Sequence, residues 1–332
     1  MQTRPEPISQ SRRVTRRPVH GLLLLDKALG LSSNQALQKA RWLLHADKAG
    51  HTGTLDPLAS GVLPLCFGAA TKFSQLQLDA DKAYHAVARL GCTTSTGDAE
   101  GQREQERAVE VDATQIERVQ ARFTGAISQL PPMHSALKKD GKPLYAYARA
   151  GIAVERTPRS VHVHALELAL HHDAGIWSLQ MKVRCSKGCY IRTLAQDIGE
   201  ALGCGAHLTA LRRTETGVFG LGGCVTLDAL EQMSEAQRVA QLRPVSDLLA
   251  DHVRIELVPS DAGRFLSGLR RRGPWPDAPR VAVFGCPPHA LLGSAHVRGG
   301  ELIPERLLSP LEIEQILAAE RSTETDFSER PA

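Results

Sequence analysis

Residues 50–64, with the sequence GHTGTLDPLASGVLP, constrain the fold of this chain more than any other stretch. Three glycines and two prolines within it force turns, because glycine reaches backbone conformations closed to other residues and proline fixes its own φ. The only carboxylate of the stretch, Asp56, precedes Pro57, which disfavours helix at Asp56. The pattern presents the Asp56 side chain outward, as a nucleophile or a charge anchor requires. The alternative is an ordinary Asp-Pro turn or a helix N-cap.

Local patterns predict strands and helices on both sides of this loop. Residues 21–25 (GLLLL) form a short unbroken apolar run, which predicts a buried strand, and residues 62–67 predict another. Ser32 and Gln35 have the spacing of a capping box, so a helix begins between the first strand and the loop. We expect a short helix over residues 71–78 and a longer helix that stops at Gly125.

Residues 83–90 alternate with the period of a β-strand. Tyr84 shares one face with small alanines and Leu90, while His85 and Arg89 lie on the other. Small side chains beside the tyrosine ring predict an open pocket rather than a packed core.

Residues 160–172 and 176–185 also alternate, and a short polar turn separates them, which predicts an antiparallel hairpin. Adjacent strands with short links favour an antiparallel or mixed sheet over a doubly wound one. The predicted fold class is therefore α+β, with a mixed, largely antiparallel central sheet flanked by helices. His162 and His164 share one strand face, but no third ligand accompanies them, so we predict no metal site.

A basic, aromatic segment precedes this hairpin. Residues 130–149 combine prolines and two tyrosines with four cations, which are Lys138, Lys139, Lys142 and Arg149. Cations interleaved with aromatic rings suit an RNA backbone and its exposed bases. A solvated surface helix is the alternative.

A helix is predicted to begin near Tyr190 and to stop at Gly203. Its apolar stripe consists of Ile191, Leu194, Ile198 and Leu202. Arg192 lies in the first turn, where a cation opposes the helix dipole, so helix stability does not explain this residue. A carboxylate that pairs with Arg192 would explain its position.

The C-terminal region changes character. Short strands between glycine and proline turns are predicted at residues 253–257, 281–284, 290–297 and 301–303, which indicates a small β-barrel-like domain. We predict a basic disordered arm over residues 1–18, a catalytic domain over 19–249 with an insertion at about 130–152, a β-domain over 250–308, and an acidic disordered tail over 309–332.

Composition limits the class of protein. The net charge of +4 permits a nucleic-acid partner without demanding one. Seven cysteines without paired spacing argue against a disulfide framework. No apolar run approaches the ~20 residues of a membrane span, and no signal-peptide pattern is seen. We therefore expect a cytoplasmic protein that does not contact a membrane.

The run HTGTLDPLASGVLP closely resembles the catalytic motif of the TruB family, the bacterial tRNA pseudouridine-55 synthases. Residues 93–101, 130–149, 186–194 and 202–214 resemble further segments of that family in the same order. The resemblance extends weakly to residue 308, where the family has an RNA-binding domain of the PUA type. One departure is Ala28, which follows Asp26 and Lys27 where the family usually has proline.

The resemblance implies an isomerisation of one uridine in the T loop of tRNA, in which the base is detached and rejoined through carbon 5 without a cofactor or metal. Asp56 is implied as the carboxylate that either stabilises the positive charge on the sugar or attacks as a nucleophile. Arg192 is implied as the guanidinium that orients Asp56 and lowers its pKa. Tyr84 is implied as the ring that receives the extruded base and assists removal of the carbon-5 proton.

Three further residues are assigned by the same resemblance. His51 is implied to fill the space that the flipped base vacates, and Tyr190 and Leu211 to contact the uracil. Lys27 is interpreted as structural. The four cations of residues 130–149 are implied to hold the RNA backbone.

Two other functions are compatible with this reading. One is a tRNA-folding chaperone that acts on the T arm without catalysis, against which the intact Asp56, Tyr84 and Arg192 argue. The other is a guide-RNA-dependent enzyme with partner proteins, against which the lysines around Lys138 argue. We expect a monomer that binds the T arm and needs no obligate protein partner.

Overall fold

The computed structural model describes residues 15–328, with side chains described as far as residue 321. Within this part of the chain, nine strands form a central sheet in the order β1-β3-β12-β4-β11-β10-β7, in which β2 also pairs with β3 and β13 with β12. All neighbours in it are antiparallel except β3 and β12. Its strands are β1 (Gly21–Lys27), β2 (Ala49–His51), β3 (Ala59–Phe67), β4 (Lys82–Leu90), β7 (Gly125–Gln129), β10 (Arg159–Asp173), β11 (Ile176–Cys185), β12 (Ala206–Thr216) and β13 (Phe219–Gly220). The predicted α+β class with a mixed, largely antiparallel sheet is confirmed.

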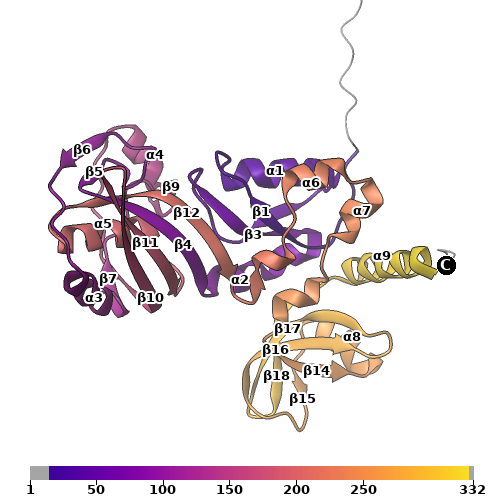
Figure 1. Cartoon of the computed structure of the whole chain (residues 1–332). Helices are drawn as coiled ribbons and strands as arrows, with labels where there is room; N and C mark the ends of the chain where they lie inside the picture. The colour runs from indigo at the N-terminus through magenta and orange to yellow at the C-terminus, as the bar shows by residue number, and fades with distance from the viewer. Residues whose placement is uncertain (1–14, 329–332) are drawn as a thin grey trace, which may run out of the picture.

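Helices pack along this sheet and beyond it (Figure 1). The helices are α1 (Ser33–Leu43), α2 (Ser74–Asp79), α3 (Ala113–Arg122), α4 (Leu144–Arg149), α5 (Ile191–Ala201), α6 (Leu227–Gln232), α7 (Glu235–Ala240), α8 (Pro259–Leu266) and α9 (Pro310–Ser328). Short 3-10 turns occupy η1 (Gly68–Phe73), η2 (Leu221–Gly223) and η3 (Val245–Leu249). The helix predicted over residues 71–78 is therefore the end of η1 followed by α2.

Local sequence signals explain several boundaries. The predicted capping box is present at α1, where the Ser32 side chain accepts from the Gln35 backbone and the Gln35 side chain accepts from the Ser32 backbone. The hairpin of β10 and β11 turns through Ala174 and Gly175, both at positive φ, as a two-residue turn requires. Helix α5 begins after Tyr190 and ends at Leu202, before Gly203 at φ 83°.

Residues 21–25 of strand β1 form an unbroken apolar run because both faces of the strand are buried there. Leu23 and Leu25 belong to the main core with α1 and α5, whereas Leu22 and Leu24 belong to a second cluster with η3. Central strands buried on both faces read as continuous apolar runs rather than alternating ones. The strand predicted from residues 21–25 is confirmed.

Strand β4 is covered on one face only. Ala86, Ala88 and Leu90 lie in the main core, while His85 is exposed on the opposite face. The prediction that these alanines border an open pocket beside Tyr84 is wrong, because Ala86 and Ala88 are buried in the main core, to which α5 also contributes. Small side chains here allow close approach of a helix.

A second sheet follows the first. Its strands, in the order β14-β16-β17-β18-β15, are β14 (Val253–Leu257), β16 (Ala278–Gly285), β17 (Ala290–Arg298), β18 (Glu301–Leu307) and β15 (Arg271–Arg272). The sheet curls around α8, whose Phe265 is fully buried in its core (Figure 1). The four predicted C-terminal strands are present, and α8 was not predicted. The exact domain boundaries remain a prediction.

The acidic tail is not wholly disordered as predicted. Helix α9 begins at Pro310, and its Ile313 and Ile316 pack against the second cluster. Glu312 forms an ion pair of 2.6 Å with Lys72 of η1. The predicted basic arm falls mainly on residues 1–14, outside the described residues. Arg17, which is described, pairs with Glu235 at 2.7 Å.

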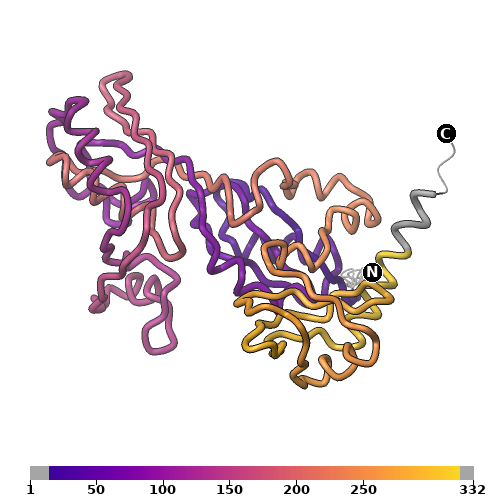
Figure 2. Tube along the Cα trace, turned by 90° about the horizontal axis from the view of Figure 1, so that it is seen from below, coloured from indigo at the N-terminus to yellow at the C-terminus, as the bar shows by residue number. Residues whose placement is uncertain are grey.

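Residues 130–158 project from the end of the central sheet between β7 and β10 (Figure 2). They contain a small hairpin, β8 (Lys138–Lys139) and β9 (Lys142–Pro143), followed by α4. Asp140 and Gly141, both at positive φ, make its turn. A second ribbon, β5 (Cys92–Thr94) with β6 (Arg103–Glu106), follows β4.

Candidate active site

The loop between β2 and β3 carries Asp56 on the helix-covered face of the central sheet. Ser33, in the first turn of α1, fixes this loop by donating to the Leu55 carbonyl at 2.9 Å and accepting from the Leu55 amide at 2.7 Å. Leu55 itself is buried in the main core. The next residue is therefore held at the surface of the core, and the Asp56 side chain keeps 39% of its area exposed.

Arg192 holds this carboxylate. Its Nη2 lies 2.8 Å from Asp56 Oδ2, and the Arg192 side chain is only 6% exposed. The same guanidinium donates to the carbonyls of Thr96 at 3.0 Å and His134 at 2.6 Å. These contacts account for an arginine in the first turn of α5, where the helix dipole disfavours one.

A second carboxylate faces Arg192. Asp98 Oδ2 lies 3.4 Å from Arg192 Nη1, and the Asp98 side chain is 3% exposed. Thr96 Oγ1 donates to Asp98 Oδ1 at 2.5 Å, and the Glu100 amide donates to the same oxygen at 3.1 Å. Arg192 is thus held between a buried, fully bonded aspartate and an aspartate with an open side.

Charges around Asp56 shift its pKa in both directions. Burial raises the pKa and outweighs Arg192, which lowers it, and the negative charge of Asp98 raises it further. Arg192 thus lowers the pKa of Asp56, as the resemblance implies, but burial decides the direction of the net shift. Burial also lowers the pKa of Lys27 to about 8, although nearby Asp56 raises it.

Tyr84 and His51 lie around another arginine. Arg213 of β12 stands directly opposite Tyr84 of β4, and its Nη2 donates to the Gly53 carbonyl at 3.2 Å. His51 at the end of β2 is half-buried, and its pKa is lowered first by burial and then by the charge of Arg213. Its Nδ1 is buried and has no hydrogen-bond partner among the described residues.

Tyr190 and Leu211 border the site from α5 and β12. The backbone of Tyr190 is fixed by the buried Gln129, which accepts from its amide at 3.0 Å and donates to its carbonyl at 3.3 Å. Leu211 stands opposite Ala59 of β3 and Ala86 of β4 and is nearly buried. Asp56 also raises the pKa of Tyr190, after the larger effect of burial.

The four cations of the basic segment lie on the projecting hairpin and α4. Lys138, Lys139, Lys142 and Arg149 are all exposed. Lys139 donates to the Glu155 carbonyl at 3.2 Å, and Arg149 lies 5.4 Å from the ring centre of the exposed Tyr145. The structure does not bring these cations into contact with Asp56, but His134 of the same segment bonds to Arg192.

Two models of known protein domains match adjacent parts of this chain. The model of the TruB family pseudouridylate synthase N-terminal domain matches residues 41–191, and that of the tRNA pseudouridylate synthase B C-terminal domain matches residues 192–253. The chain belongs to the TruB family. The resemblance seen in the sequence is confirmed.

Named relatives of the family cover almost the whole chain. The chain is 64% identical to tRNA pseudouridine synthase B of Verminephrobacter eiseniae, over 95% of this chain and 96% of that one. It is 57% identical to the protein of the same name from Ralstonia nicotianae, over 90% of this chain and 98% of that one. Family membership and these identities support an isomerase that acts on RNA.

Two solved structures share the fold of this chain. A chain in the crystal structure of a Cbf5-Nop10-Gar1 complex matches with a TM-score of 0.66 and 25% identity, over 89% of this chain and 86% of that one. A chain in the archaeal box H/ACA sRNP Nop10-Cbf5 complex matches with a TM-score of 0.64 and 24% identity, over 90% of each chain. The central sheet is thus of the pseudouridine synthase type.

Sequence reasoning missed two residues of the site. Asp98 lies in the polar stretch of residues 93–101, which was noted only as a turn that resembles the family. Arg213 lies in residues 202–214, of which only Leu211 is predicted from the sequence to belong to the site. No local signal marks Arg213, because its neighbours Arg212, Thr214 and Glu215 are themselves polar or charged.

One group of potential metal ligands lies outside the site. Among the described residues, Glu256, Cys286 and His289 of the second sheet place ligand atoms within 4.8 Å of one another. The Glu256 carboxylate is already bound by Arg254 at 2.9 Å.

Over residues 15–328, no helix is long and apolar enough to cross a membrane.

Proposed function

We propose that this protein, a tRNA pseudouridine synthase, converts the uridine at position 55 in the T loop of tRNA to pseudouridine. The observation that carries the proposal is the Asp56 carboxylate. It has one open side, and its Oδ2 lies 2.8 Å from Nη2 of the buried Arg192. A carboxylate fixed in this way can act on a sugar carbon without moving. The relatives named tRNA pseudouridine synthase B support the substrate class.

Asp56 acts when the bond between uracil N1 and ribose C1′ breaks. The bonding electrons leave with the base, so positive charge develops at C1′. Ionised Asp56 either bonds to C1′ or neutralises its charge, and both roles need the carboxylate rather than the acid. Arg192 keeps Asp56 oriented and favours the ionised form, against the burial that favours the acid.

The detached base then turns and rejoins C1′ through carbon 5, which must lose its proton. Tyr84 is proposed to receive the extruded uracil against its ring and to take part in this proton transfer. The unbonded His51 Nδ1 supports a place for His51 in the opened RNA, because a buried ring nitrogen without a partner is costly unless a ligand completes it. Tyr190 and Leu211 are proposed to contact the uracil.

Binding of the T arm is assigned to the projecting segment. Its exposed lysines and the paired Tyr145 and Arg149 suit phosphates and unstacked bases. The curled second sheet is proposed as a further RNA-binding domain of the PUA type. Because one chain supplies Asp56, Arg192 and Tyr84, we infer a monomer without an obligate partner, acting in the cytoplasm. The proposed steps are carried by Asp56, Arg192 and Tyr84 alone and cause no net oxidation or reduction, so the proposal invokes no cofactor.

The experiment is conversion of an unmodified tRNA transcript by the purified protein, followed by mapping of pseudouridine at nucleotide resolution. A single new pseudouridine at position 55 is expected. A transcript with cytidine at position 55 should give no product. Modification at another position, or of many uridines, would overturn the assigned specificity.

A further inference from the structure

A single row of directly paired residues crosses the central sheet beneath the site. In the pairing of β12 with β4, Arg213 stands opposite Tyr84, and in the pairing of β12 with β3 it stands opposite Gly61. Gly61 in turn pairs with Lys27 of β1, and Tyr84 with Val183 of β11. Side chains of directly opposed residues lie on the same face, so Arg213 and Tyr84 are cross-strand neighbours.

Arg213 is buried without a carboxylate. Its exposed fraction is 1%, and among the described residues no Asp or Glu forms an ion pair with it. Its Nε donates to the Val62 carbonyl at 2.7 Å, and Nη2 donates to the Gly53 carbonyl at 3.2 Å. A buried charge of this kind is stable only when its donors are satisfied, and the directly opposed Tyr84 is the nearest side chain across β4 that can offer a further acceptor.

The backbone beside Arg213 leaves no freedom to shift. A side-chain carbon at Gly61 would lie 2.1 Å from the Arg213 carbonyl oxygen, and Gly61 has φ +104°. The two strands therefore approach as closely as glycine allows, which fixes the position of the Arg213 backbone relative to β3. The guanidinium thus bonds to strand β3 and to the loop that carries Asp56, and it lies on the same sheet face as Tyr84.

We propose that Arg213 is a positioning residue for the carbon-5 proton transfer and acts through the hydroxyl of Tyr84. The inference rests on the proposed function. A guanidinium has only donors, so the Tyr84 oxygen must accept from it, and the phenolic hydrogen points away from Arg213. The oxygen is thereby held at a fixed place relative to Gly53 and the Asp56 loop.

The proton transfer balances as follows. After C5 has bonded to C1′, the C5 proton passes to the Tyr84 oxygen while the phenolic proton passes to water. The electrons of the C5–H bond restore the C5–C6 double bond, those of the N1–C6 double bond return to N1, which takes a proton from water, and Tyr84 ends as a neutral phenol. Negative charge builds on the Tyr84 oxygen during this exchange, and the hydrogen bond from Arg213 stabilises it.

The electrostatics agree with this role. Burial raises the pKa of Tyr84 to about 12, and Arg213 opposes the shift by its charge and its hydrogen bond. Without Arg213 the hydroxyl would be a buried polar group with one fewer partner and a still less stable phenolate.

The test compares single-turnover conversion of tRNA that carries ordinary uridine with tRNA that carries uridine deuterated at carbon 5. Arg213→Gln is expected to slow conversion by about 10- to 100-fold, the worth of a hydrogen bond to a charged group, and to make proton removal rate-limiting. A primary deuterium isotope effect larger than that of the wild type should then appear. Arg213→Lys, which keeps the cation but has one donor group, should fall between the two.

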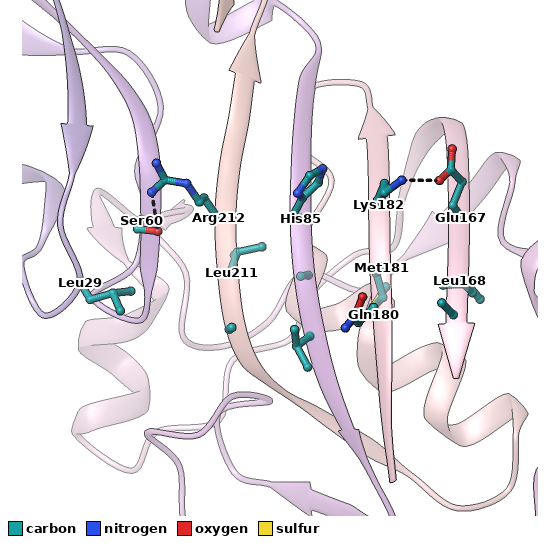
Figure 3. A pocket seen from close by; sticks show the side chains of 14 residues that line it. Leu29, Ser60, His85, Glu167, Leu168, Gln180, Met181, Lys182, Leu211 and Arg212 are labelled. Carbon is teal, nitrogen blue, oxygen red and sulfur yellow. Dashed lines mark hydrogen bonds and ion pairs between the residues drawn. The ribbon is translucent and has the colours of Figure 1, made fainter. Parts of the chain in front are cut away.

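The matched control is Arg212→Gln. Arg212 is the next residue of β12 and points to the opposite face, into the shallow pocket with Ser60 and His85 (Figure 3). There it pairs with Asp26 at 2.7 Å. Its loss removes the same charge, so rate and isotope effect should match the wild type.

A slower Arg213→Gln protein with an unchanged isotope effect would overturn the proposal, because Arg213 would then act before the proton step or through the fold alone. Wild-type speed in Arg213→Gln would also overturn it. Should the Gln variant fail to fold, Arg213→Lys decides by the same isotope effect. Failure of the wild type to form pseudouridine would instead refute the proposed function.

Discussion

The backbone carbonyl of His134 accepts a hydrogen bond of 2.6 Å from Arg192 Nη2, the nitrogen that also pairs with Asp56. His134 belongs to the projecting segment that we propose as the RNA-binding element. A single hydrogen bond therefore links this segment to the guanidinium that orients the Asp56 carboxylate. Ordering of the segment on RNA is expected to tighten the site at the same time.

Charge reversal of the three hairpin lysines should weaken tRNA binding and flatten its dependence on salt. Each phosphate contact releases counterions, so losing contacts reduces the slope of log K against log salt. Filter binding at several salt concentrations measures the slope. A control reverses three cations on the opposite sheet face, which are Arg89, Lys182 and Arg184. An unchanged slope in the hairpin variant would remove this hairpin from the RNA-binding surface.

Asp56→Asn should abolish isomerisation while RNA affinity stays within about tenfold, or about 1.4 kcal/mol. The amide keeps the shape but loses the negative charge that the C1′ centre requires, whereas binding rests on many phosphate and base contacts. Single-turnover conversion and filter binding of one transcript give both quantities. Asp79→Asn, which removes a carboxylate from a surface pair with Lys187, is the control. Near-normal conversion by Asp56→Asn would take Asp56 out of the mechanism.

Asp98→Asn should slow conversion by about tenfold or more and lower the free energy of unfolding by about 1–3 kcal/mol. The substitution removes the buried negative charge against one side of Arg192, which then loses its fixed orientation toward Asp56. Rates and thermal unfolding are measured together. Thr96→Val removes one hydrogen bond to Asp98 and keeps the charge, so it should cost less in both. Equal losses in the two variants would show that charge is not the cause.

The rate should fall at acid pH, above the range in which a free aspartate is protonated. The pKa of Asp56 is raised by burial, so lowering the pH protonates it earlier and removes the active carboxylate. Arg192 lowers this pKa, so Arg192→Met should move the acid limb to higher pH and reduce the rate throughout. Single-turnover rates across pH test this, with Arg212→Met as control. An acid limb that does not move in Arg192→Met would mean that another group controls it.

Patterns confined to a few neighbouring residues were readable from the sequence. The capping box of α1, the turn after β10 and the apolar run of β1 each need only local chemistry, and each is present. The loop of Asp56 could be singled out because its glycines, prolines and carboxylate lie within one stretch.

Features that depend on distant partners were not readable. Arg213 reaches Tyr84 only through the pairing of β12 with β4, whose register contains two irregularities. Asp98 gains its role from the position of α5, and burial of Asp56 by the assembled core decides the direction of its pKa shift. The order of α9 likewise depends on Ile313 and Ile316 meeting a surface made by other elements.

The second cluster has a consequence for how the molecule holds together. Leu22 and Leu24 of β1 share it with Ala282 of β16 and Leu308 after β18, so both sheets contribute to one apolar interior. Lys72 and His20 add polar links to α9, through Glu312 and Gln315. The two sheets are therefore expected to melt in one cooperative transition. A chain cut near residue 250 would expose the underside of β1 and of β3, the strand that follows the Asp56 loop, so catalysis is expected to depend on the second sheet even where that sheet touches no RNA.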